Sequence, residues 1–151
     1  METISTVQGR DFFMVKRICA VIIAACLAVS VAPQSAPVFS GGDGIYTVCV
    51  GDGSSGCFYT FPTEEIYKFY HFKKVEGQSL FTRDQGFVRE FISDFGCVCV
   101  YEEWAQGIEI KYYYTPKISA YRLINGQKVN LQTAKTANGC TIGTPVIFGG
   151  F

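Results

Sequence analysis

The chain has 151 residues, the usual size of a single domain. Its composition is 48% hydrophobic and 15% aromatic, which excludes a disordered chain. The formal net charge is zero, so the composition offers no electrostatic attraction to the phosphates of a nucleic acid.

A segment with the pattern of a secretory signal lies near the start of the chain. Met14 is followed by the basic pair Lys16-Arg17 and by an apolar run over residues 18–32 that carries no charge. This run has the length of a signal-peptide core and is short for a membrane span. The chain is therefore predicted to be extracytoplasmic, either secreted after cleavage near Ser30 or held at the membrane by the uncleaved segment.

The signal pattern sets the predicted domain organisation. Residues 1–36 are predicted to be an N-terminal extension with a signal peptide or membrane anchor. Residues 37–44 are Gly-rich and are predicted to be a linker. Residues 45–151 are predicted to form the folded domain, because apolar runs alternate there with turn signals.

The predicted domain begins with a hairpin. Residues 45–50 and 57–61 are rich in β-branched and aromatic residues, and they flank a loop rich in Gly and Ser. Residues 62–72 carry apolar residues at helical spacing, which predicts a short helix. Their Tyr and Phe content leaves a strand as the alternative.

The strongest helical pattern covers residues 82–95. Thr82 and Gln85 have the spacing of a capping box at the start of a helix. Gly96 stands where a glycine commonly ends a helix. The apolar residues between them share one stripe of the helix, namely Phe87, Val88, Phe91, Ile92 and Phe95.

Strands are predicted for the rest of the chain. Asn125-Gly126 is the strongest short hairpin signal, and Asn138-Gly139 is a second one. Pro145 cannot donate to a β-ladder, so the last strand is predicted to lie at an edge or to be broken there. Together the elements predict an α+β domain, in which an antiparallel sheet of about five to seven strands has one or two helices packed on one face. The predicted strands cover residues 97–104, 107–115, 117–124, 127–135 and 140–148.

The cysteines beyond the signal segment are odd in number and do not form a closed disulfide framework. Cys49 and Cys57 flank the loop of the predicted hairpin and would allow a cross-strand disulfide. Cys97 and Cys99 would share one face of a strand and are the candidates for a redox pair. The preceding helix C-terminus disfavours a thiolate there, so buried, unreactive cysteines are the favoured interpretation. The full set is Cys49, Cys57, Cys97, Cys99 and Cys140.

No arrangement of residues predicts a catalytic, cofactor or metal site. The Gly-rich loop at residues 51–56 lacks the Lys that a phosphate-cradling loop needs, and His71, the only histidine, has no acid or serine near it in the sequence. Glu102 and Glu103 are adjacent, so in a strand they would point to opposite faces rather than form a carboxylate pair. The tyrosines of residues 112–114 alternate between two faces, and core packing is favoured over a stacking platform for a ligand.

Two motifs near the end of the chain carry the pattern of a known family. They are Val129-Asn130-Leu131-Gln132-Thr133-Ala134 and Ile142-Gly143-Thr144-Pro145-Val146-Ile147. With the preceding YTPKISAYRLI they resemble the YwmB family, exported proteins of spore-forming Gram-positive bacteria that are described as TATA-box-binding-protein-like. The resemblance covers about the last forty residues, and the chain is short for the family. It implies a small α+β fold with a curved antiparallel sheet and helices on one side, and it implies no established activity. Its signature residues are Asn130, Leu131, Gln132, Gly143, Thr144 and Pro145.

The sequence therefore predicts an exported or membrane-anchored, non-enzymatic binding module at the cell envelope, whose partner is a protein or another envelope component. A contact with the membrane is expected through the N-terminal segment if that segment stays uncleaved. A thiol-active envelope protein using Cys97 and Cys99 is the first alternative. DNA binding is the second alternative, and it rests on the family's label alone. A minor-groove binder needs basic residues and apolar wedges on its sheet, and a shared fold does not carry function, so no nucleic-acid partner is expected.

Overall fold

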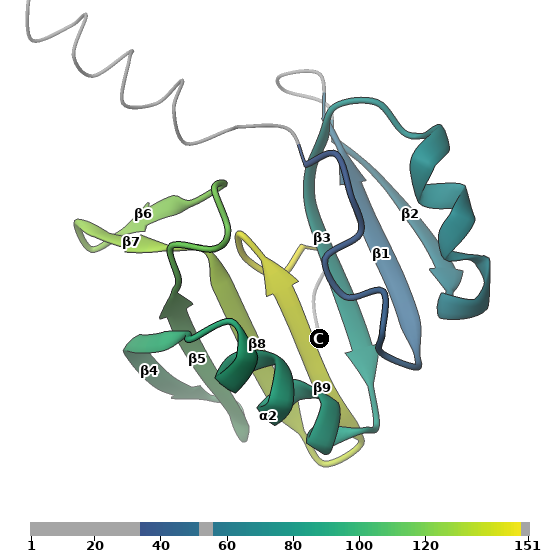
Figure 1. Cartoon of the computed structure of the whole chain (residues 1–151). Coiled ribbons are helices and arrows are strands. Elements are labelled where there is room, and N and C mark those ends of the chain that lie inside the picture. The colour runs from purple at the N-terminus through teal and green to yellow at the C-terminus, as the bar shows by residue number, and fades with distance from the viewer. Residues whose placement is uncertain (1–33, 52–55, 149–151) are drawn as a thin grey trace, which may run out of the picture. The chain divides into compact units, whose positions relative to one another are not determined.

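Seven strands form one antiparallel sheet in a computed structural model that describes residues 34–51 and 56–148 (Figure 1). The strand order is β2-β1-β3-β9-β8-β5-β4, and β6 and β7 form a separate two-stranded hairpin. The predicted α+β class with a curved antiparallel sheet is confirmed. Most of the predicted signal segment lies outside the described residues. The elements are β1 (Ile45–Val50), β2 (Cys57–Pro62), the 3-10 helix η1 (Thr63–His71), β3 (Val75–Thr82), α2 (Gln85–Asp94), β4 (Val98–Ala105), β5 (Ile108–Tyr114), β6 (Arg122–Ile124), β7 (Gln127–Val129), β8 (Leu131–Thr136) and β9 (Gly139–Thr144).

The core lies between one face of the sheet and a layer made by α2, η1 and residues 34–44 (Figure 1). Phe91 of α2 contacts Phe39, with ring centroids 5.1 Å apart. Phe69 of η1 meets Tyr46 of β1 edge to face at 6.3 Å. Such aromatic pairs stabilise a small core beyond the area that they bury. The described residues contain no helix that is long and apolar enough to cross a membrane.

Residues 37–44 are part of the folded unit, so the prediction of a linker is wrong. Phe39 is fully buried in the core. The backbone N–H of Val38 donates to Oε1 of Gln78 at 2.8 Å, and Nε2 of Gln78 donates to the carbonyl of Ala36 at 3.0 Å. The glycines here serve close packing rather than flexibility, because a Cβ on Gly42 would lie 2.3 Å from a methyl carbon of Leu80.

β3 is a central strand that the sequence patterns did not predict. It pairs with β1 on one side and with β9 on the other. Most of its residues are buried, on both faces of the sheet. One face meets the helical layer, and the other meets the C-terminal segment, where a Cβ on Gly77 would lie 1.9 Å from the ring of Phe148. A strand covered on both faces has no apolar-polar alternation.

Both predicted helices exist, and the start of α2 differs from the prediction. Its N-cap is Asp84, whose Oδ1 accepts from the N–H groups of Gly86 at 2.8 Å and Phe87 at 3.1 Å. Thr82 ends β3, and its hydroxyl accepts from the N–H of Asp84 at 3.0 Å. The predicted capping box is therefore wrong, because a better acceptor lies two residues further along the chain.

The end of α2 confirms the prediction at Gly96. This glycine has φ +60°, the left-handed conformation that glycine adopts without strain. Its N–H donates to the carbonyl of Ser93, and the N–H of Cys97 donates to the carbonyl of Ile92, each at 2.9 Å. This pair of bonds is a Schellman motif, which satisfies carbonyls at the end of a helix.

The strands after α2 follow the predicted order with three changes of extent. Asn125 and Gly126 both have positive φ and form the predicted tight turn, although β6 covers only the end of the range 117–124. The range 127–135 is divided into β7 and β8 at Asn130. β9 lies in the middle of the sheet and ends before a cis Thr144-Pro145 bond, so Pro145 marks a break rather than an edge.

Candidate interaction surface

β4 forms one edge of the seven-stranded sheet, and within the described residues it pairs with β5 alone. Three large apolar side chains of this strand are exposed. Val98 is 65% exposed and Trp104 is 72% exposed, and Tyr101 lies between them with 43% of its surface exposed. We call these three residues the β4 edge surface. An edge strand with exposed apolar side chains offers unpaired backbone groups and binding area to an extended segment of another chain.

The β4 edge surface lies on both faces of the sheet, because Tyr101 and Trp104 are three residues apart in the strand. The register shifts between Cys99 and Tyr101 and leaves Val100 as the extra residue. Tyr101 lies opposite Tyr112, with ring centroids 5.6 Å apart, on the face away from α2. Trp104 lies opposite Glu109, on the face that α2 covers further along the sheet. A partner strand at this edge would therefore meet apolar side chains above and below its own plane.

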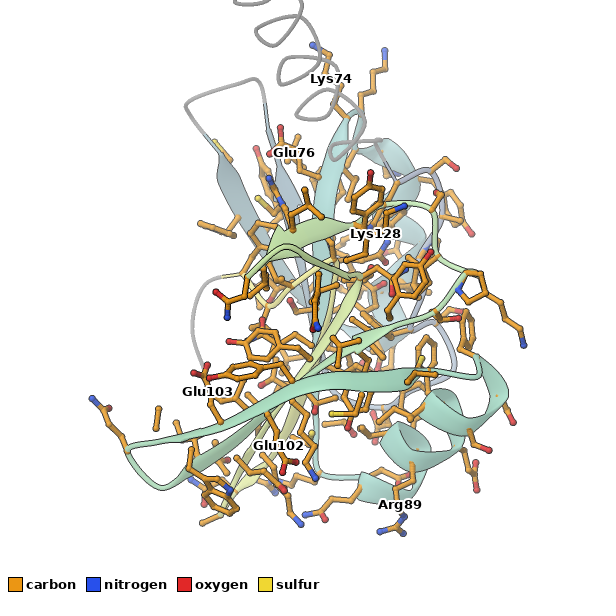
Figure 2. All side chains as sticks on the ribbon, turned by 90° about the vertical axis from the view of Figure 1, so that its left-hand side faces the viewer. Lys74, Glu76, Arg89, Glu102, Glu103 and Lys128 are labelled. Atoms are coloured by element: carbon orange, nitrogen blue, oxygen red, sulfur yellow. The ribbon has the colours of Figure 1, made fainter. Side chains whose placement is uncertain are left out.

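Two carboxylates lie between Tyr101 and Trp104, and they point to opposite sides of β4 (Figure 2). Glu102 lies 3.8 Å from Nζ of Lys111. Oε1 of Glu103 accepts from the hydroxyl of Tyr112 at 2.7 Å. Burial, and then this hydrogen bond, raise the pKa of Tyr112 to about 12. The two carboxylates therefore do not act as a pair, and they place negative charge on both sides of the edge.

A charged cleft lies next to Glu102, between α2 and the outer strands β5 and β8. Its volume is about 160 Å³, and its walls include Arg89, Lys111 and Lys135 as well as Glu109. Nζ of Lys111 is 2.8 Å from Oε1 of Glu109, and the hydrogen bond to this carboxylate raises the pKa of Lys111. The ion pairs with Glu102 and Glu109 hold Lys111 on the sheet. The α2 side of the edge therefore carries both positive and negative charge beside Trp104.

The structure places the predicted thiol pair in two different settings. Cys97 lies before β4, in the turn that ends α2, and it packs against the core. Burial raises the pKa of Cys97 to about 11. Cys99 lies in β4 and is exposed, and its Sγ donates to the carbonyl of Tyr101 at 3.5 Å. A half-buried thiol with a raised pKa is a poor nucleophile at neutral pH, so this geometry favours the interpretation of Cys97 as a packing residue.

Cys97 is expected to react slowly with iodoacetamide in the folded protein. Because burial raises the pKa of Cys97 to about 11, the thiolate fraction at pH 8 is about 100-fold smaller than that of an ordinary thiol. Alkylation of Cys97 in native protein should therefore be about 100-fold slower than in protein unfolded by urea. Mass spectrometry of the alkylated peptides measures both rates, and exposed Cys99 is the internal control. Equal rates at Cys97 in the two states would show that the thiol is activated in the fold.

The predicted disulfide between Cys49 and Cys57 does not form. The register pairs Cys49 with Phe58 and Val50 with Cys57, so the two cysteines lie on opposite faces of the hairpin. Cys49 is buried and Cys57 is exposed, and both are free. In this register, strand alternation puts the two side chains on opposite faces. The register depends on the loop between the strands, and it could not be derived from the sequence.

The signature residues of the YwmB resemblance have structural roles. Asn130 is fully buried at the break between β7 and β8. Its Nδ2 donates to the carbonyls of Thr115 at 2.6 Å and Ile118 at 2.8 Å, and its Oδ1 accepts from the N–H of Thr115 at 2.9 Å. Oε1 of Gln132 accepts from the N–H of Ile147 at 2.8 Å, which holds the C-terminal segment against the sheet. The other signature residues are also buried, namely Leu131, Gly143, Thr144 and Pro145.

The β4 edge surface was not identified from the sequence, which drew attention to the tyrosines of β5 instead. In the structure Tyr113 is buried, while Tyr112 and Tyr114 are partly buried between strands. The core packing favoured for these residues agrees with this arrangement. The sequence signal for β4 was the cluster of aromatic and acidic residues over 101–104. Its meaning depends on which strand lies at the edge.

Comparison of the chain with protein-family models, with curated proteins and with solved structures found no match. The resemblance to the YwmB family therefore rests on the closing residues of the sequence alone, and family membership stays a prediction. The geometry of the β4 edge surface and the predicted signal segment are the features that bear on function.

Proposed function

We propose that the chain is an exported or membrane-anchored, non-enzymatic binding module that holds an extended segment of a protein partner along β4. The β4 edge surface carries this proposal. Trp104, Val98 and Tyr101 are three of the nine exposed large apolar side chains of the described residues, and they lie together on one edge strand. Exposed aromatic residues on a sheet edge are the usual anchors when a peptide adds a strand to a sheet.

The charge of the edge restricts the chemistry of the partner. Glu102 and Glu103 lie at the centre of β4 on opposite sides. Two identical β4 strands that met with these residues opposed would bring like charges together, which is destabilising. A partner segment with basic residues between apolar ones complements the edge on both faces. We therefore infer that the partner is an extended, basic and apolar protein segment rather than a second copy of this strand.

The location outside the cytoplasm rests on the signal pattern of residues 14–36. The family that the closing motifs resemble is exported as well, which agrees with that pattern.

Labelling of Cys99 by a membrane-impermeant maleimide tests the location and the binding surface together. We expect Cys99 to be labelled in intact cells of the source organism, and to react several-fold more slowly there than in purified protein because the partner covers β4. A Ser93→Cys variant, on the exposed side of α2, is the matched control and should react equally fast in both samples.

Two outcomes would contradict the proposal, each at a different point. If neither thiol is labelled until the cells are lysed, the chain is not exported. If Cys99 reacts at the same rate in cells and in purified protein, the β4 edge is uncovered and does not hold a partner.

A further inference from the structure

A second group of exposed aromatic residues lies at the opposite end of the sheet from β4. η1 packs beside β2 through Phe69 and through Phe72, whose ring lies 4.7 Å from that of Tyr59. Tyr67 and Tyr70 of the same helix are exposed. They are three residues apart, and in a 3-10 helix residues with this spacing share one side. We call Tyr59, Tyr67 and Tyr70 the η1 surface.

Basic residues gather at one end of the η1 surface. η1 has acidic residues in its first turn and Lys68 and His71 in its last turn. Lys73 and Lys74 follow the helix and lead into β3. Lys68 is paired with Glu65. Tyrosines beside lysines are the combination that proteins place at the boundary between water and lipid, because the ring is amphipathic and lysine attracts anionic head groups.

The chain enters the described fold at this same basic end. The backbone N–H of Gln34 donates to the carbonyl of Val75 at 2.7 Å, and Val75 directly follows Lys74. Figure 1 shows that η1 runs back along β2 to the end of the sheet where β3 begins. Lys74 and Glu76 lie at that end in Figure 2, far from Glu102 and Glu103. In the sequence, the apolar run of residues 18–32 ends two residues before Gln34.

We propose that the η1 surface lies on an anionic lipid surface, with Tyr67 and Tyr70 at the level of the head groups. This inference goes beyond partner binding and shares with the proposed function only its placement at the envelope. The occupant is lipid because the sequence shortly before Gln34 contains the apolar run of residues 18–32, and because Lys73 and Lys74 outnumber Glu76 at this end of η1. β4 is six strand spacings away from β2 in the sheet, each of about 4.8 Å, which puts the two strands on the order of 29 Å apart. Docking of η1 on lipid would therefore leave β4 free for a partner.

Tryptophan fluorescence tests the docking, because the chain has one tryptophan and it lies in β4. The probe protein is the full chain with Tyr70→Trp and Trp104→Phe, and the matched control is the native chain with Trp104. Vesicles contain phosphatidylcholine and phosphatidylglycerol, with or without bromine on the acyl chains. We expect brominated vesicles to lower the emission of the introduced tryptophan about twofold or more, since an indole at head-group level lies next to the acyl chains. Emission from Trp104 should not change. Vesicles of phosphatidylcholine alone should quench the introduced tryptophan less, because they lack the negative surface potential.

Three results would overturn the docking proposal. If Trp104 is quenched and the introduced tryptophan is not, β4 lies on the lipid. If both are quenched equally, or neither is quenched, the protein does not dock in a fixed orientation. A blue shift of the introduced tryptophan when the protein is concentrated without vesicles would show that a second copy covers η1. None of these measurements depends on the partner or on the cellular compartment, so a failure here is distinct from a failure in the Cys99 labelling experiment.

Discussion

Replacement of Phe39 by alanine is expected to lower the free energy of unfolding by about 3–5 kcal/mol. Phe39 is fully buried, and its ring contacts Phe91 at 5.1 Å and Tyr46 at 6.3 Å. Removal of the ring leaves a cavity where the N-terminal segment, α2 and the sheet meet. Urea unfolding followed by far-UV circular dichroism measures the change.

Phe58→Ala is the matched control for Phe39→Ala. Phe58 lies on edge strand β2 with about half of its surface exposed, so its removal should cost less than about 1 kcal/mol. An equally small loss in both variants would mean that residues 37–44 do not belong to the core and act as the linker that the sequence predicted.

Replacement of Asn130 by alanine should also destabilise the fold strongly, by about 3 kcal/mol. The side chain makes three hydrogen bonds to the backbone of Thr115 and Ile118. Alanine would leave these buried groups without their partner, and each unsatisfied group costs about 1–3 kcal/mol. The segment of residues 115–118 would then lose its side-chain attachment to the break between β7 and β8.

The matched control for Asn130→Ala is Asn138→Ala, in the exposed turn between β8 and β9. The backbone N–H of Asn138 donates to Oγ1 of Thr136 at 3.2 Å, and this bond does not need the side chain, so the change should stay within about 0.5 kcal/mol. If the two variants have the same urea midpoint, that result would contradict the structural role assigned to Asn130.

The parts of the fold that the sequence predicted are those with local signals. The hairpin of β1 and β2 lies in two short aromatic runs, and α2 shows one apolar stripe that ends at Gly96. The turn at Asn125-Gly126 needs two residues with positive φ, and these two residue types adopt it most readily. Each of these signals is contained within about ten residues, so no tertiary contact is needed to interpret it.

β3 could not be predicted because its pattern depends on contacts that are distant in the sequence. Gln78 is polar, yet it is fully buried, because the hydroxyl of Tyr46 donates to its Oε1 and its Nε2 donates to Gln34. Gly77 is required because the ring of Phe148 occupies the space of a side chain. A strand built from buried polar and small residues resembles a loop in the sequence.

The candidate surface was missed for a topological reason. The chain leaves β3 in the middle of the sheet, and α2 carries it across to the far edge, where β4 begins (Figure 1). Exposure of Val98, Tyr101 and Trp104 follows from that crossover rather than from the residues themselves. In a central strand the same side chains would have been core residues.

Photo-cross-linking in cells tests the role of β4 most directly. A benzophenone amino acid is placed at position 104 or 101 of the full chain, and at position 90 on the exposed side of α2 as the matched control. The proposed function predicts that positions 104 and 101 cross-link to one defined protein and that position 90 does not. Cross-linking that is absent at both β4 positions, or that is equally strong at position 90, would contradict β4 as the binding edge.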